Sequence, residues 1–127
     1  MAGGALDRET LDALGERREI QMITSRRDGS NASRPVWSVV VDGQAYVRSY
    51  RGPSGAWYRR ALADGRAAIA VDGETIEVSA EPEHDDELNR RISDAFQSKY
   101  GETSPAPTEA MVRPEVVATT LRLTTIS

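Results

Sequence analysis

Several short stretches of the chain alternate apolar and polar residues, which is the period of a β-strand with one buried face. The first such stretch, residues 19–25, places Ile20, Met22 and Thr24 on one side. The polar residues 26–33 that follow predict a flexible loop. The alternation returns at the end of the chain, where residues 115–126 predict a closing strand.

Two β-hairpins are the clearest predictions from the pattern. Each consists of two β-rich runs joined by an Asp-Gly pair, namely residues 35–41 and 44–50 around Asp42-Gly43, and residues 67–71 and 74–80 around Asp72-Gly73. An Asp-Gly pair favours the positive φ angles of a two-residue type I′ turn, and the twist of that turn matches the twist of paired antiparallel strands.

Three other stretches repeat apolar residues at helical spacing. The N-terminal segment 1–18 contains the first, in which Leu11 and Leu14 follow a candidate N-cap, Asp7. A short second helix starts near Trp57, with Ser54 as its candidate cap.

The third helix covers residues 83–100, and its acidic first turn complements the helix dipole. Residues 101–114 then form a Pro-rich connection to the closing strand. The resulting order of elements is helix, strand, hairpin, helix, hairpin, helix, strand. Six strands that are joined mostly by hairpins predict a single α+β domain, a six-stranded antiparallel barrel with short helices inserted between strands.

The amino-acid composition excludes several kinds of functional site. The chain of 127 residues has the size of one domain and contains no cysteine, which excludes disulfides, thiolate nucleophiles and iron–sulfur clusters. Its single histidine, His84, precedes an acidic run and is interpreted as a solvated residue near a helix start, so no metal site is predicted. The chain also shows neither a secretory signal nor a membrane span, and we therefore expect a cytoplasmic protein.

Charge is distributed unevenly along the chain. Between Arg17 and Arg66, ten arginines accompany four acidic residues, a balance of +6, whereas five basic residues accompany twelve acidic ones from Ala67 onward, a balance of −7. The basic half is therefore where we expect an anion to bind. A sequence pI of about 5.0 and the absence of a lysine-rich stripe argue against nucleic acid as the partner.

The best candidate site is the segment from Tyr46 to Arg60. Alternation along its strand puts Tyr46, Arg48 and Tyr50 on one face, which is a poor face for a core. The strand end then leads into a helix start, where backbone N–H groups and Arg side chains suit an anion.

Aromatic residues near this strand end suggest that the ligand also contains a flat ring. Trp57 and Tyr58 stand in the second helix, and Trp37 lies on the first strand of the first predicted hairpin. In the alternative interpretation, Trp57 anchors the core, and Arg59 and Arg60 are only its solvated neighbours.

The run RPVWSVVVDGQAYVRSYRGPSGAWYRRALADGRAAIAVDGETIEVSA resembles the bacterial family DUF2255. That family is similar to the split β-barrel superfamily of pyridoxamine-phosphate-oxidase-like and deazaflavin-dependent nitroreductase-like proteins. The resemblance covers about residues 19–126 and implies a split barrel that forms a homodimer. It further implies an oxidoreductase that transfers hydride to or from a small molecule through FMN or the deazaflavin F420.

The resemblance also assigns residues by position. The cofactor-binding residues that it implies are Arg48, Ser49 and Arg51 at the strand end and Ser54, Trp57, Tyr58 and Arg59 at the helix start. We expect a substrate to contact Trp37, Tyr46 and Tyr50. Flavin-binding members often have a Lys at the start of that helix, where this sequence has Gly55-Ala56.

Two other functions are compatible with the same residues. A protein of this fold without a redox cofactor would bind another anionic or aromatic small molecule in the arginine-rich site. A cofactor-independent isomerase or cyclase would use Tyr46, Tyr50 or Tyr58 for proton transfer. The chain shows no acid–base or nucleophilic cluster that would choose between them.

Overall fold

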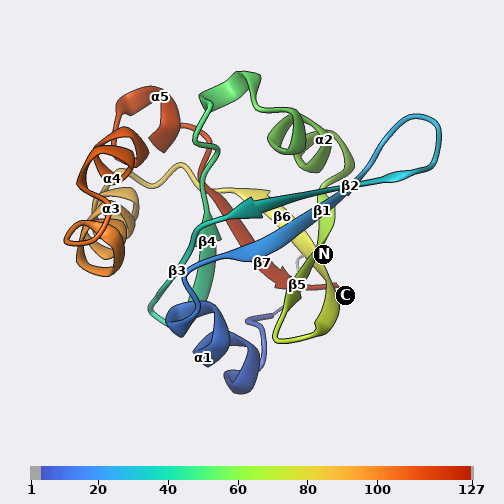
Figure 1. The fold of residues 1–127 in the computed structure, drawn as a ribbon, viewed down its shortest axis with the longest axis horizontal. Coiled ribbons are helices and arrows are strands. Elements are labelled where there is room, and N and C mark those ends of the chain that lie inside the picture. Colours follow the sequence, from blue (N-terminus) through green and yellow to red (C-terminus); the bar gives the residue numbers. More distant parts are fainter. Residues whose placement is uncertain (1–3, 127) are drawn as a thin grey trace.

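The computed structural model describes residues 4–126 and contains one curled sheet with helices around it (Figure 1). The elements in chain order are α1 (Arg8–Glu16), β1 (Ile20–Ser25), β2 (Asn31–Val36), β3 (Ser38–Val41), β4 (Gln44–Val47), the 3₁₀ helix η1 (Gly52–Ser54), α2 (Ala56–Asp64), β5 (Arg66–Val71), β6 (Glu74–Pro82), α3 (Asp86–Tyr100), α4 (Pro105–Met111), α5 (Pro114–Val117) and β7 (Leu121–Thr125).

The sheet order is β2-β1-β5-β6-β7-β4-β3, and every pair of neighbours is antiparallel. The two edge strands, β2 and β3, are consecutive in the chain and are separated only by Trp37. One continuous segment therefore connects the two edges of the curled sheet and leaves a seam there. The α+β antiparallel split barrel predicted from the sequence is confirmed.

The sheet has seven strands in the described residues, and the prediction of six was wrong because it missed β2. Residues 31–36 pair along their full length with β1, from Ser25↔Asn31 to Ile20↔Val36. A tight turn begins at Arg26, whose N–H donates to Ser30 O at 2.8 Å. The predicted loop 26–33 is thus only a turn, because ladder hydrogen bonds compensate for the polar composition of this edge strand.

Both predicted hairpins are confirmed. Asp42 and Asp72 each have a φ of 52°, and the glycines that follow have φ values of 74° and 81°. These are the left-handed conformations that a type I′ turn requires at both central positions. The first hairpin is shorter than predicted, because β4 ends at Val47.

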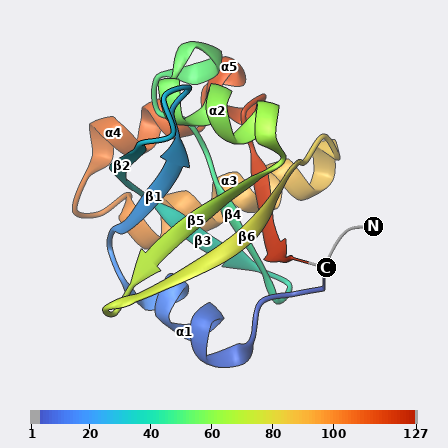
Figure 2. The same ribbon diagram turned by 90° about the vertical axis from the view of Figure 1, so that its right-hand side faces the viewer.

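Two apolar cores stabilise the sheet. The barrel interior holds residues such as Met22, Val47, Ile69 and Leu123, and α1 and α2 pack on this core at opposite ends (Figures 1 and 2). The second core lies on the outer face of β3 and β4, where α3 and the two short helices after it pack. Tyr46 belongs to this second core.

Helix ends agree in part with the predicted caps. The Asp7 carboxylate accepts a hydrogen bond from Thr10 N at 2.8 Å, as a capping residue does. Ser54 does not cap α2; it lies in η1, and Gly55 is the N-cap. The predicted Pro-rich connection contains α4, since proline is tolerated in the first turn of a helix. No helix in residues 4–126 is long and apolar enough to cross a membrane.

Candidate functional site

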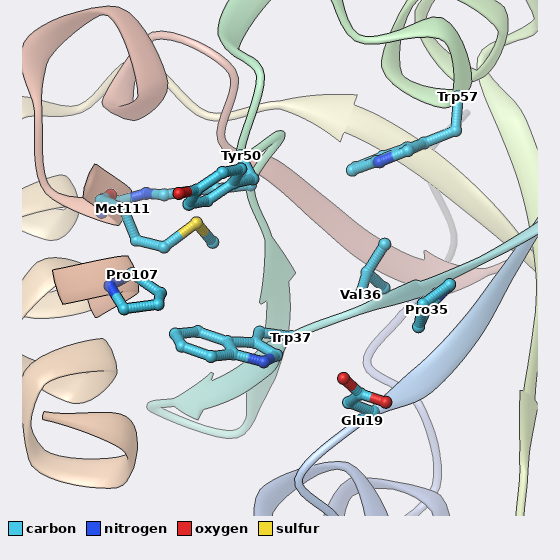
Figure 3. A pocket seen from close by; sticks show the side chains of 9 residues that line it. Glu19, Pro35, Val36, Trp37, Tyr50, Trp57, Pro107 and Met111 are labelled. Carbon is cyan, nitrogen blue, oxygen red and sulfur yellow. Dashed lines mark hydrogen bonds between the residues drawn. The ribbon is translucent and has the colours of Figure 1, made fainter. Parts of the chain in front are cut away.

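A pocket of about 290 Å³ opens at the seam of the barrel, beside the residue that separates β2 from β3. Its lining comes from β1–β2, the end of β4, α2 and α4: Glu19, Pro35, Val36, Trp37, Arg48, Tyr50, Trp57, Pro107 and Met111. Figure 3 shows the Trp37, Tyr50 and Trp57 rings around the opening, with Met111 and Pro107 at one end and Glu19 at the other. Three of the nine lining residues are therefore aromatic, and two, Glu19 and Arg48, are charged.

The Trp37 ring is fixed by stacking on Tyr100, with the ring centroids 3.9 Å apart and the planes at 3°. The Tyr100 hydroxyl donates to Arg18 O at 2.8 Å and accepts from Ser38 N at 3.3 Å. The Arg18 guanidinium lies 5.6 Å from the Trp37 ring centroid and 5.5 Å from that of Tyr100. These contacts hold Trp37 rigidly as one wall.

Arg48 contributes to the pocket from its buried side and is only 1% exposed. Its Nε and both Nη atoms donate five hydrogen bonds, to Thr120 Oγ1 at 2.8 Å, Ser93 Oγ at 2.8 Å, Met111 O at 3.0 Å, Asn89 O at 2.9 Å and Asn89 Oδ1 at 3.3 Å. All of these acceptors are neutral. Burial lowers the pKa of Arg48 to about 10, so the group stays cationic near neutral pH.

A tight loop connects this strand end to α2. Ser49 is buried, its hydroxyl donates to Gly52 O at 2.8 Å, and its N–H donates to Thr119 Oγ1 at 2.9 Å. The backbone of Gly55 lies against the Ser49 side chain, leaving no room for a Cβ. This close approach fixes where α2 begins and thereby places Trp57, in its first turn, at the pocket.

The ten residues predicted from the sequence to form one site do not all meet. Four of them line the pocket: Trp37, Arg48, Tyr50 and Trp57. Ser49 acts within the chain by shaping the loop. Arg51, Ser54 and Arg59 are exposed and lie outside the pocket lining.

The two other tyrosines of the predicted site are in the cores and do not line the pocket. Tyr46 is 2% exposed and Tyr58 is 8% exposed. The prediction that the face of Tyr46 and Arg48 is unsuited to a core is wrong, because α3 covers it and supplies acceptors for the guanidinium. Burial also raises the pKa of Tyr46. Of the tyrosines considered for proton transfer, only Tyr50 reaches the pocket.

Five lining residues were missed from the sequence. Glu19, Pro35 and Val36 lie at the starts of predicted strands, and nothing in the sequence pattern marked them as binding residues. Pro107 and Met111, in contrast, are four residues apart on α4, which is the spacing of one helix face. Recognising proline as a helix start in residues 101–114 would have predicted that shared face.

The titratable groups that line the pocket are few. Glu19 is the carboxylate among them and is exposed to solvent, whereas Arg48 is buried. Water and salt screen an exposed charge far more than a buried one, so the inner part of the pocket is electropositive. In residues 4–126 there is no group of three His, Asp or Glu side chains that could hold a metal ion.

Comparisons with known proteins agree with this architecture. The family model described as "Uncharacterized protein conserved in bacteria (DUF2255)" matches residues 10–123. No curated protein matches the sequence.

Solved structures with the same fold have low sequence identity to the chain. The heme storage protein HutZ from Vibrio cholerae is similar with a TM-score of 0.68 and 16% identity, over 97% of this chain and 92% of that one. An F420-H2 dependent reductase is similar with a TM-score of 0.61 and 12% identity, over 84% and 94%. A structure described as a domain-swapped dimer has a TM-score of 0.63 and 14% identity, over 84% and 80%.

Proposed function

The chain belongs to the DUF2255 family, and we propose that it binds the flat ring of a flavin or deazaflavin in the seam pocket and acts as an oxidoreductase on a small molecule. The observation that carries this proposal is the arrangement of Trp37, Tyr50 and Trp57 around a buried Arg48 whose hydrogen-bond partners are all neutral. The structural similarity to an F420-H2 dependent reductase supports it.

The residues that line the pocket suit such a ring. Trp37 offers a rigid flat surface, because its stacking on Tyr100 leaves little rotational freedom. Met111 supplies a polarisable thioether that adapts to an aromatic partner. Aromatic side chains at both the strand side and the helix side allow a planar group to lie between them.

The buried charge of Arg48 favours an electron-rich ring. All five guanidinium donors are used within the chain, so Arg48 acts on a ligand through its field and not through a direct hydrogen bond. A positive charge in a low-dielectric region stabilises negative charge on a bound ring. A flavin or deazaflavin supplies hydride transfer when bound, and a positive field beside its ring favours the reduced, more electron-rich form.

A binding titration tests the proposal directly. FMN and F420 are titrated separately into the protein, and binding is followed by quenching of tryptophan fluorescence and by the absorbance of the cofactor. We expect one of them to bind at micromolar concentration. Trp57→Leu should weaken that binding about three- to tenfold, which is the change in affinity that corresponds to the loss of one aromatic contact.

Leu62→Ala is the matched control, because Leu62 is on the same helix, is 43% exposed and does not line the pocket. The control should bind as the wild type does. If neither cofactor binds, the redox proposal is refuted. Binding of a non-redox aromatic carboxylate in place of both cofactors would instead identify a cofactor-free small-molecule binding protein.

FMN and F420 also carry an anionic end, which needs hydrogen-bond donors at the rim of the pocket. We propose that Arg51, and Ser54 in η1, bind it, because Arg51 directly follows Tyr50 at the rim and its side chain is exposed. Arg51→Gln should weaken binding of FMN or F420 more than binding of lumiflavin, which has the isoalloxazine ring of FMN without the anionic tail. Equal loss for both ligands would contradict this assignment.

We also propose that the protein is a homodimer and that the partner completes the rim of the pocket. Tyr50 is 59% exposed although it lines the pocket, and Pro107 is exposed on the same side. One of the similar structures is a domain-swapped dimer. Light scattering coupled to size-exclusion chromatography should give twice the chain mass of 13.9 kDa. A monomer at micromolar concentration would refute this part of the proposal.

A further inference from the structure

Four arginines surround a second hollow on the outer side of α2. Arg26 and Arg27 belong to the β1–β2 turn, and Arg59 and Arg60 belong to α2. The hollow measures about 660 Å³, and its other lining residues are Ser25, Ala56, Ala63 and Asp64. Figures 1 and 2 show the β1–β2 hairpin running beside α2. Small side chains thus leave space between two basic elements.

Two of these arginines are held in place by neutral groups. The Nε atom of Arg60 donates to Thr24 Oγ1 at 2.8 Å, and among residues 4–126 its two Nη atoms have no hydrogen-bond partner. The Nη1 atom of Arg26 donates to Asn31 O at 2.9 Å and to Ser30 Oγ at 3.2 Å. Both guanidiniums are therefore positioned but still have N–H donors to offer.

The other two arginines of the hollow are Arg27 and Arg59. Within residues 4–126, the side chains of Arg27 and Arg59 have neither a hydrogen-bond nor an ion-pair partner. Their guanidiniums are exposed on the two sides of the same hollow. They are free to adjust to a ligand.

Two acidic residues offset part of the positive charge at the hollow. Asp64 lines it, and Asp28 lies in the same turn as Arg26 and Arg27. The Asp28 carboxylate accepts hydrogen bonds from Ser30 N at 2.9 Å and Ser30 Oγ at 2.6 Å, which hold it within the turn. Four arginines against two acids leave a local balance of +2, whereas the chain carries −4 overall. Some arginines on other faces are paired, as in Arg17–Asp72 and Arg91–Asp42.

We propose that this hollow is a binding site for a polyphosphate group of a small molecule. The planar guanidinium matches two phosphate oxygens at once, and two facing pairs can hold adjacent phosphates. The site is distinct from the seam pocket, because the two share no lining residue. It does not depend on the proposed redox function.

Isothermal titration with inorganic tripolyphosphate tests the site, with ionic strength matched by sodium chloride. We expect the wild-type protein to bind this probe. Arg27→Gln and Arg59→Gln should each weaken binding about tenfold, which is the change in affinity that corresponds to the loss of one hydrogen bond to a charged group. Neither substitution removes a contact within the protein, so the thermal midpoint should not change.

Arg8→Gln is the matched control, since it removes one exposed positive charge from α1, on the other side of the barrel. The control should keep the wild-type affinity for tripolyphosphate. An equal loss in the control and in Arg59→Gln would show only long-range attraction and overturn the proposal. Absence of binding by the wild type at millimolar probe would do the same, as would an oligonucleotide that binds here and is not displaced by tripolyphosphate.

Discussion

Replacing Arg48 with methionine removes the cation that joins four separate segments of the chain. Its guanidinium connects β4 to α3, to the end of α4 and to the residue before β7 through five hydrogen bonds. Methionine keeps an unbranched apolar stem, but it is shorter than arginine and has no donor. Among the acceptors left in the buried site are the backbone carbonyls of Asn89 and Met111, which water cannot easily reach.

The cost of this substitution can be worked out from the structure. Hydrogen bonds to a charged group contribute about 1.5 kcal/mol each at the lower end of their range, or about 7.5 kcal/mol for five. Burying the charge opposes this gain, and the fall of the Arg48 pKa to about 10 corresponds to about 3 kcal/mol. We therefore expect Arg48→Met to lower the free energy of unfolding by about 4 kcal/mol.

Urea unfolding followed by tryptophan fluorescence measures this loss, because Trp37 and Trp57 both report on the folded site. Arg48→Lys is the informative comparison. It keeps the charge but not the planar fork, so it should lose about half as much stability. A loss below about 1 kcal/mol for Arg48→Met would show that the hydrogen bonds only compensate for burying the charge, and it would refute a net stabilising role of Arg48.

Three further predictions concern stability. Gly55→Ala places a Cβ against the Ser49 side chain and should cost about 1–3 kcal/mol in urea unfolding, with a wild-type result contradicting the close approach. Gly73→Ala forces a left-handed conformation in the β5–β6 turn and should cost about 1–2 kcal/mol, whereas Gly4→Ala, in open space, should cost nothing measurable. Burial raises the pKa of Tyr100 to about 12, above its usual ~10, so stability should be intact below pH ~10 and fall as the pH rises toward ~12. Tyr100→Phe should make that fall shallower in urea titrations on both sides of pH ~10, and an unchanged slope would contradict the assignment.

The parts of the fold that follow from local chemistry were predictable from the sequence. The two Asp-Gly pairs determine their turns within four residues, and the N-cap at Asp7 acts across three residues. Strand β2 was missed because its residues, NASRPV, are polar and contain a proline. Its strand character comes from pairing with β1, which is information that the segment alone does not contain.

The structural role of Arg48 could not be predicted from its neighbours in the sequence, because it also depends on distant segments. Its hydrogen-bond partners lie between 41 and 72 residues away along the chain, and two of the five acceptors are backbone carbonyls, which any residue carries. The alternation rule placed Tyr46 and Arg48 on one face correctly. It did not show that α3 would cover this face, since that depends on how distant segments pack.

The separation of the predicted site into two follows from the geometry of α2. Successive residues on a helix point about 100° apart, so Trp57 reaches the seam pocket while Arg59 and Arg60 line the hollow on the outer side. Neighbours in the sequence of a short helix therefore need not share a ligand. The same geometry makes the two sites separable in experiment. Trp57→Leu should weaken binding of the flat ring and leave tripolyphosphate binding unchanged. Arg59→Gln should weaken tripolyphosphate binding and leave binding of the flat ring unchanged. If either substitution weakened both ligands equally, the pocket and the hollow would be parts of one site.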